Sequence, residues 1–150
     1  MPTTLSQQSL PGLVGKTLGP SEWIEVTQER INQFAEASGD RQWIHVDEER
    51  AKDGPFGRTI AHGVLTLAMT SSVSKDVFKF DGFKMGVNYG YDKIRFPTPV
   101  PVGSRVRLLA KVLDYTPAGN TLQTILEMTI EVEGAAKPAC VAQMIFRHTP

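Results

Sequence analysis

One stretch decides the fold of this chain: Gly63-Val64-Leu65-Thr66-Leu67-Ala68-Met69-Thr70-Ser71-Ser72-Val73. Wound into a helix, it places apolar and small side chains on every side, which indicates a helix enclosed by the rest of the protein. A buried strand is the alternative interpretation. Because the run is long for a strand, and because Ala and Met favour a helix, the sequence predicts a central apolar helix here.

After this helix the period of the apolar residues changes to two, which is typical of strands with one buried face. The alternating runs begin near Val87, continue over residues 105–112 and 122–132, and end with a strand from Cys140 to near Arg147. Turn residues separate the last three runs, at 116–120 and at Gly134-Ala135. Successive hairpins packed against helices predict an α+β fold with an antiparallel sheet.

Before the central helix, the sequence predicts two further helices and a short strand over residues 22–26. Thr27 can cap the first helix, and Gly39 ends it because glycine readily adopts the left-handed conformation past a helix end. A second, short helix follows Asp47 and ends at Gly54-Pro55. The apolar stripe of the first helix recurs at i, i+3, i+4 and i+7 and consists of Ile31, Phe34, Ala35 and Ser38.

The chain is predicted to be one domain, residues 21–150, preceded by an N-terminal arm, residues 1–20, that shows little periodicity. Residues 1–12 lack a basic region followed by an apolar run, so we expect no secretory signal. The most apolar stretch, residues 63–73, has about half of the roughly 20 residues that span a bilayer. These features predict no membrane span and a cytoplasmic location.

The composition excludes several classes of function. Sixteen basic residues balance sixteen acidic residues, which gives no general attraction to nucleic acid. A single cysteine, Cys140, excludes an internal disulfide and a multi-cysteine metal site, and its small apolar neighbours predict a buried thiol. No phosphate-binding loop, dinucleotide fingerprint, zinc-protease motif or serine nucleophile motif is present, and three dispersed histidines argue against a metal site.

The first candidate for chemistry is the pair Asp40 and His45, which stand five residues apart after Gly39. On a continuous helix such residues would point about 140° apart, but a turn after the glycine can aim both at one point. A carboxylate and an imidazole that share a water molecule can polarise it and move its proton. Considered alone, an aspartate in this position is more often a turn or cap residue, and a histidine beside Ile44 and Val46 is more often a partly buried structural residue.

The second candidate is Gly63, at the start of the central helix and directly after His62. Backbone N–H groups at a helix N-terminus are unpaired and can donate to an anionic oxygen, such as that of an enolate. Glycine there leaves room for a ligand carbonyl, or it lets the helix pack closely on a strand. We interpret His62 as a cap or packing residue. Asn88, Tyr89 and Tyr91 could line an acyl tunnel or belong to the core or an interface.

Together, the two clusters resemble the MaoC-like dehydratase family of (R)-specific enoyl-CoA hydratases. The hallmark of that family is an aromatic residue, a short gap, Ser/Thr-Gly-Asp, a variable residue, Asn-Pro, an aliphatic residue and His. Gln42-Trp43 replaces the Asn-Pro pair, while segments 56–65 and 95–103 resemble the family's lead into its central helix and its later strand-turn pattern. The resemblance spans about residues 20–148 and is strongest to small mycobacterial-type members. The residues that match the hallmark are Phe34, Ser38, Gly39, Asp40, Ile44, His45 and Ala51.

This resemblance implies a hot-dog fold, in which a curved antiparallel sheet wraps a central helix, and a homodimer that binds an acyl thioester at its interface. Asp40 and His45 become the catalytic pair, the Gly63 amide becomes the donor to the thioester carbonyl, and Ser71 supports the loop that bears the pair. The expected reaction is the hydration of trans-2-enoyl-CoA to (R)-3-hydroxyacyl-CoA in fatty-acid metabolism. No metal or redox cofactor is expected, since coenzyme A, or an acyl carrier protein, arrives with the substrate.

Two alternatives remain open at this point. A hot-dog thioesterase could use a carboxylate near a helix N-terminus to hydrolyse acyl-CoA. A non-enzymatic subunit could bind acyl chains and stabilise a dehydratase partner, although the Asp40 and His45 pair would then have no role.

Overall fold

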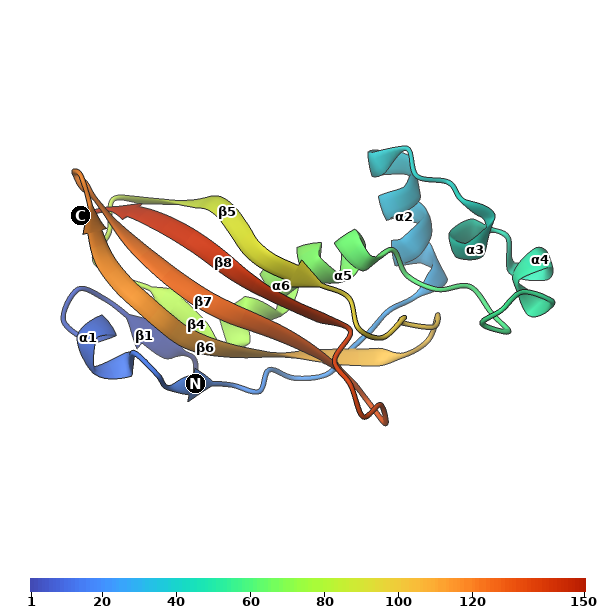
Figure 1. Cartoon of the computed structure of the whole chain (residues 1–150), viewed down its shortest axis with the longest axis horizontal. Helices are drawn as coiled ribbons and strands as arrows, with labels where there is room; N and C mark the ends of the chain where they lie inside the picture. Colours follow the sequence, from blue (N-terminus) through green and yellow to red (C-terminus); the bar gives the residue numbers. More distant parts are fainter.

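The computed structural model describes residues 1–150 as a curved sheet with helices packed against it (Figure 1). The main sheet has the strand order β2-β6-β7-β8-β5, with β3 also paired to β6 and every pair antiparallel. Its strands are β2 (Thr17–Leu18), β3 (Ile24–Glu25), β5 (Met85–Arg95), β6 (Arg105–Ala118), β7 (Thr121–Val132) and β8 (Cys140–Thr149). A separate parallel pair consists of β1 (Thr3–Leu5) and β4 (Phe78–Phe80).

The helices are short, and none has the length and apolar character needed to cross a bilayer. They are α1 (Leu10–Leu13), α2 (Gln28–Ser38), α3 (Trp43–Val46), α4 (Glu48–Lys52), α5 (Gly63–Ala68), α6 (Thr70–Val73) and the 3₁₀ turn η1 (Ser74–Asp76). The α+β layout with an antiparallel sheet is therefore confirmed.

The long strands follow the predicted alternation. Every second residue is buried from Val106 to Val112 in β6 and from Thr124 to Val132 in β7, with Leu108, Leu126 and Ile130 fully excluded from solvent. Cys140 lies on the same inner face of the sheet and is fully buried, as predicted, and this burial raises the pKa of its thiol to about 11. Strand β5 ends at Arg95, where the Pro-rich turn begins.

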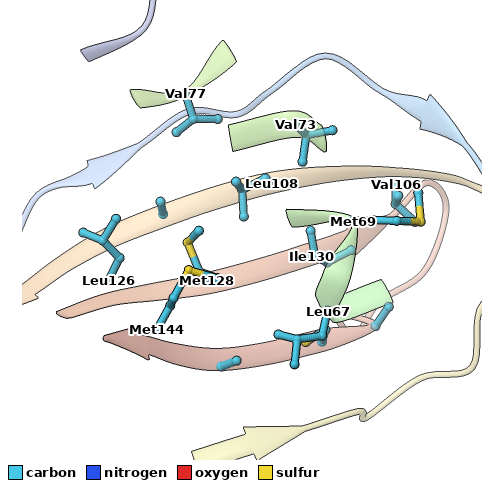
Figure 2. Packing of buried hydrophobic residues seen from close by; sticks show 14 of the residues in the cluster. Leu67, Met69, Val73, Val77, Val106, Leu108, Leu126, Met128, Ile130 and Met144 are labelled. Carbon is cyan, nitrogen blue, oxygen red and sulfur yellow. The ribbon is translucent and has the colours of Figure 1, made fainter. Parts of the chain in front are cut away.

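The predicted central helix exists, but it is divided at Met69 into α5 and α6. Its side chains Leu67, Met69 and Val73 point toward the sheet and belong to the same buried cluster as the strand residues (Figure 2). The opposite side of the helix is open in the single chain, where Val64, Ala68, Ser71 and Ser72 are exposed. The prediction of a helix enclosed on every side is wrong for this reason: the sheet covers only one side.

The first 20 residues, expected to form an arm, pack onto the rest of the chain. Strand β1 pairs with β4, β2 pairs with β6, and Leu5, Leu10 and Leu18 are buried in the common core. These strands have only two or three residues, too few to show a period of two in the sequence.

Helices α2, α3 and α4 form a helical excursion, residues 27–60, that lies at one end of the sheet (Figure 1). The loop 100–104 between β5 and β6 holds both ends of it. Val26 donates to Ser104 O at 2.8 Å and accepts from Gly103 N at 2.8 Å, while Ala61 N donates to Val100 O at 2.8 Å. The excursion therefore leaves and rejoins the sheet at one place.

At the far end of the sheet, His148 is buried among aromatic rings, with the ring of Phe80 centred 3.9 Å away and that of Phe83 4.8 Å away. Burial lowers the pKa of His148, and its Nδ1 has no hydrogen-bond partner. A Cβ atom at Gly86 would overlap this ring, so glycine is required where β5 passes it.

Candidate active site

The loop that carries Asp40 is shaped by the end of α2. Thr27 caps the start of this helix by accepting from Arg30 N, as predicted, and Gly39 ends it in the left-handed conformation with φ of 80°. The Ser38 hydroxyl donates to Phe34 O at 2.8 Å and accepts from Asp40 N at 3.2 Å. Asp40 Oδ1 accepts from Gln42 N at 3.3 Å, which leaves Oδ2 of this exposed carboxylate free.

His45 lies on α3 and is buried. Its Nδ1 is 2.7 Å from Ile60 O, and because a carbonyl oxygen only accepts, Nδ1 must carry the proton. The lone pair of the ring is therefore on Nε2. The backbone of His45 is also fixed, since its carbonyl accepts from Gln28 Nε2 at 2.8 Å and the Gln28 Oε1 accepts from Thr59 at 2.5 Å.

The Gln42-Trp43 pair keeps the turn between the two residues. Gln42 is the N-cap residue of α3 and Trp43 is its first helical residue, a position where proline is also tolerated. The Trp43 ring packs on Gly54, where a Cβ would lie 3.0 Å away, and the Arg50 guanidinium lies 4.2 Å above the ring. The tryptophan thus ties α3 to the end of α4 by packing.

Asp40, His45 and Gly63 line one pocket of about 310 Å³, together with Phe34, Ser38, His62 and Val64. A carboxylate oxygen of Asp40 and ring nitrogens of His45 and His62 lie within 4.8 Å of one another. One water molecule that makes two ordinary hydrogen bonds spans such a separation. The structure therefore brings together three of the four residues expected from the sequence.

His62 is the site residue whose role sequence reasoning missed. It stands at the N-cap position of α5, as expected, but its side chain makes no capping hydrogen bond. Instead its Nε2 lies 2.9 Å from Asp40 O, and its ring stacks on that of His45 with centroids 3.8 Å apart. The Phe34 ring, which also lines the pocket, is centred 4.8 Å from the His62 ring. Its position next to Gly63 was the only sequence signal.

Gly63 is the first residue of α5, so its N–H has no partner within the helix, and no other acceptor in the chain takes it. A Cβ atom added at Gly63 would point at Phe96 and lie 2.9 Å from its ring. Both interpretations of this glycine are therefore compatible with the structure: Gly63 lines the pocket and its N–H is unpaired, and its backbone approaches a neighbouring side chain closely.

Ser71 lies apart from these residues. It lines a second pocket, of about 390 Å³, whose apolar wall is built from Phe78, Phe80, Met128, Met144 and Phe146. Asn88 lines the same pocket and donates to the Tyr91 hydroxyl at 2.6 Å, whereas Tyr89 is exposed. Within the single chain, Ser71 and the Asp40 loop border different pockets.

Asp40, His45 and His62 are also the three residues that could offer ligands to a metal ion. Two nitrogens are already committed, His45 Nδ1 to Ile60 O and His62 Nε2 to Asp40 O. The two rings are stacked with planes only 23° apart, so their in-plane lone pairs do not converge at the ~2 Å length of a metal–nitrogen bond. The geometry suits a shared water molecule better than a metal.

The charge beside the site is locally neutralised. Arg41, next to Asp40, binds both carboxylate oxygens of Glu36, at 2.8 and 3.0 Å. The hydrogen bond and the charge of Arg41 lower the pKa of Glu36, so this exposed pair stays ionised and adds little net field at Asp40.

The fold and the chain have clear relatives. The sequence pattern described as "MaoC like domain" matches residues 9–135. The "3-hydroxyacyl-thioester dehydratase Z" of Mycobacterium tuberculosis (strain H37Rv) is 50% identical over 149 residues, which cover 99% of each chain. An (R)-hydratase from A. caviae involved in PHA biosynthesis superposes with a TM-score of 0.72 at 22% identity and covers 91% of this chain and 96% of its own.

A further structural neighbour is the C-terminally truncated HadBC (3R-hydroxyacyl-ACP dehydratase) complex from Mycobacterium tuberculosis. It superposes with a TM-score of 0.70 at 15% identity and covers 89% of this chain and 96% of the other. The two solved structures confirm the predicted hot-dog fold. From the sequence pattern and the 50% identical relative, the chain belongs to the MaoC-like dehydratase family of enzymes.

Proposed function

We propose that this enzyme catalyses the reversible hydration of trans-2-enoyl-CoA to (R)-3-hydroxyacyl-CoA in fatty-acid metabolism. The observation that carries the proposal is the pocket in which the Asp40 carboxylate and the His45 imidazole lie within water-bridging distance, beside the free N–H of Gly63. The names of its relatives, a 3-hydroxyacyl-thioester dehydratase and an (R)-hydratase, describe the same reaction in its two directions.

In the proposed reaction, Asp40 and His45 hold one water molecule between them. The free Asp40 oxygen accepts one of its hydrogens, and the lone pair on His45 Nε2 accepts the other. The water oxygen attacks C3 as its proton passes to the pair, and the electrons of the double bond move toward the thioester carbonyl. A proton from the pair then reaches C2 on the same face, which completes a syn addition.

Gly63 is proposed to stabilise the charge that develops on the carbonyl oxygen. Its N–H is unpaired, and Gly63 lines the same pocket as Asp40 and His45. A preorganised donor of this kind lowers the barrier because the negative charge is larger in the enolate-like transition state than in the substrate. No metal or redox cofactor is needed in this scheme. The acyl group is carried by coenzyme A or by an acyl carrier protein.

We also propose that the enzyme acts as a homodimer. The exposed side of α5 and α6 carries Val64, Ala68 and Ser71, and the neighbouring strand β5 is an unpaired edge of the sheet. The two surfaces meet, because Ser71 of α6 and Asn88 of β5 line one pocket. A second copy would cover these apolar groups and bring the apolar pocket, and Ser71 with it, close to a pair on the other chain.

The test is crotonyl-CoA hydration, followed by the absorbance of the enoyl thioester, with chiral analysis of the product. Asp40→Asn and His45→Ala should each lower kcat by about 10² or more, the usual contribution of a general acid–base group. Glu49→Gln, which removes an exposed carboxylate outside the pocket, is the matched control and should leave kcat unchanged.

Four results would argue against the proposed function or its mechanism. Release of free thiol from a saturated acyl-CoA would favour a thioesterase. Tight binding of enoyl-CoA without turnover would favour a partner subunit of a dehydratase. Wild-type rates in folded Asp40 and His45 variants, or an (S)-product, would contradict the proposed mechanism.

A further inference from the structure

We propose that His62 is a positioning residue that fixes the places of Asp40 and His45 relative to each other and to the Gly63 amide. The inference rests on the proposed hydration, because it assigns a role within that site. It starts from a buried, titratable side chain that the mechanism above does not use: His62 is 3% exposed and contacts both members of the catalytic pair.

The contact with Asp40 is a hydrogen bond between distant parts of the chain. Since Asp40 O only accepts, His62 Nε2 carries the proton and donates over 2.9 Å. The other hydrogen bonds of Asp40 are local and longer, at 3.2 Å from its N–H to Ser38 and 3.3 Å from Gln42. The His62 bond is therefore the one that fixes this exposed loop to the buried part of the molecule.

The contact with His45 fixes the plane of its ring. The bond from Nδ1 to Ile60 O holds one edge of the His45 ring, and the stacked His62 ring, 3.8 Å away, supports its face. These supports come from residues only two positions apart in the chain. The segment Ile60–Gly63 thus orients His45, Asp40 and the N–H of Gly63 together.

His62 does not act as the base itself. Its Nε2 is committed to Asp40 O, and its Nδ1 is fully buried without any partner, so neither nitrogen meets a water molecule in the pocket. A purely structural filler at this position would be better apolar, because a buried acceptor without a donor is destabilising. The hydrogen bond to Asp40 explains why an imidazole, and not an apolar side chain, occupies this position.

The experiment separates the hydrogen bond from the shape of the ring. Steady-state kinetics with crotonyl-CoA would compare His62→Phe, which keeps a ring over His45 but has no donor, with His62→Gln, whose Nε2 can occupy the place of the imidazole Nε2. Misplacement of the pair should lower kcat of His62→Phe by about tenfold to a hundredfold, while KM stays within about threefold. His62→Gln should recover kcat to within about threefold of wild type.

The chain offers a matched control in His148, which is also buried and also has an unpaired Nδ1, but lies among Phe80 and Phe83 away from the Asp40 pocket. The same two substitutions at His148 should change Tm without changing kcat. Wild-type kcat in His62→Phe would overturn the proposal. So would a kcat of folded His62→Gln as low as that of His62→Phe, or losses at both histidines that simply follow Tm.

A second measurement does not depend on turnover. Nitrogen-15 NMR of the imidazole rings in the wild-type protein should find the proton on Nδ1 of His45 and on Nε2 of His62. In His62→Phe the His45 signals should shift, because the ring stacked on His45 has changed. The tautomer of His45 should remain the same, because its hydrogen bond to Ile60 O is kept. A proton on Nδ1 of His62 would overturn the proposal. Inactive wild-type enzyme with the expected tautomers would instead contradict the proposed function.

Discussion

Two stacked histidines, His45 and His62, carry their protons on different ring nitrogens. The direction of each hydrogen bond sets this difference, because both acceptors, Ile60 O and Asp40 O, are carbonyl oxygens. As a result, only His45 presents a lone pair to the pocket, although the two rings are 3.8 Å apart. In the proposed reaction, hydrogen-bond direction, more than proximity, therefore favours His45 over His62 as the base.

At the same scale, the role of the Gly63 N–H can be tested by removing the donor and keeping the helix. Proline is tolerated at a first helical position, and His62, with ψ of 138°, already has the conformation that precedes proline. Because any Cβ at position 63 meets Phe96, both variants carry Phe96→Ala. We expect Gly63→Pro to lower kcat about 10²-fold relative to Gly63→Ala, the scale of one lost oxyanion donor. Equal rates for crotonyl-CoA would remove Gly63 from the mechanism.

The residues of the site differed in how far the sequence could predict them. Asp40 and His45 are five positions apart and follow a helix-ending glycine, so their convergence depends on local geometry. His62 reaches Asp40 across 22 positions, and that contact exists only after the helical excursion has folded back. Ser71 was carried over from the family resemblance alone, and within the single chain it lines another pocket.

At the scale of elements, the boundaries of α2 agree with the prediction because capping is local. Thr27 and Gly39 each satisfy a helix end within a few residues of themselves. The short strands β1 and β2 could not be predicted, since their partners, β4 and β6, lie far along the chain. The open side of α5 and α6 was missed for a related reason, because burial depends on which surface the sheet covers.

Gly39 gives a prediction at this scale. Its φ of 80° is costly for other residues, but a Cβ there would meet no atom, so Gly39→Ala introduces backbone strain alone. We expect a loss of roughly 1–2 kcal/mol in the free energy of unfolding, measured by chemical denaturation. The strain adjoins Asp40, so kcat should fall as well. Gly134→Ala, at φ of 81° in the β7–β8 turn and equally open, should cost similar stability at unchanged kcat. Unchanged kcat in both variants would show that the loop tolerates the strain.

At the scale of the whole molecule, several exposed apolar side chains share one edge of the sheet. Met85, Val87 and Tyr89 stand on the edge strand β5. A long edge strand with apolar side chains is a surface on which another chain can pair. The α+β class and the antiparallel sheet followed from periodicity, whereas this surface did not, because it depends on which strand comes last in the spatial order.

The homodimer is checked by sedimentation velocity. The wild-type protein should sediment at about twice the 16.5 kDa mass of the chain. Val87→Asp places a charge on the proposed interface and should shift the population toward monomer. Val14→Asp is the control, since Val14 is an equally exposed valine, 45% against 47%, after α1 and away from β5. A monomeric wild type, or equal dissociation by both variants, would refute the proposed interface.

The loop 100–104 clamps both ends of the helical excursion, at Val26 and at Ala61. The residues that line the candidate active site lie on this excursion or just past its end, and none of them lies on the sheet. Closing a loop between fixed ends becomes more costly only slowly as the loop lengthens. A change in the length or sequence of the excursion is therefore expected to alter the pocket while leaving the sheet undisturbed.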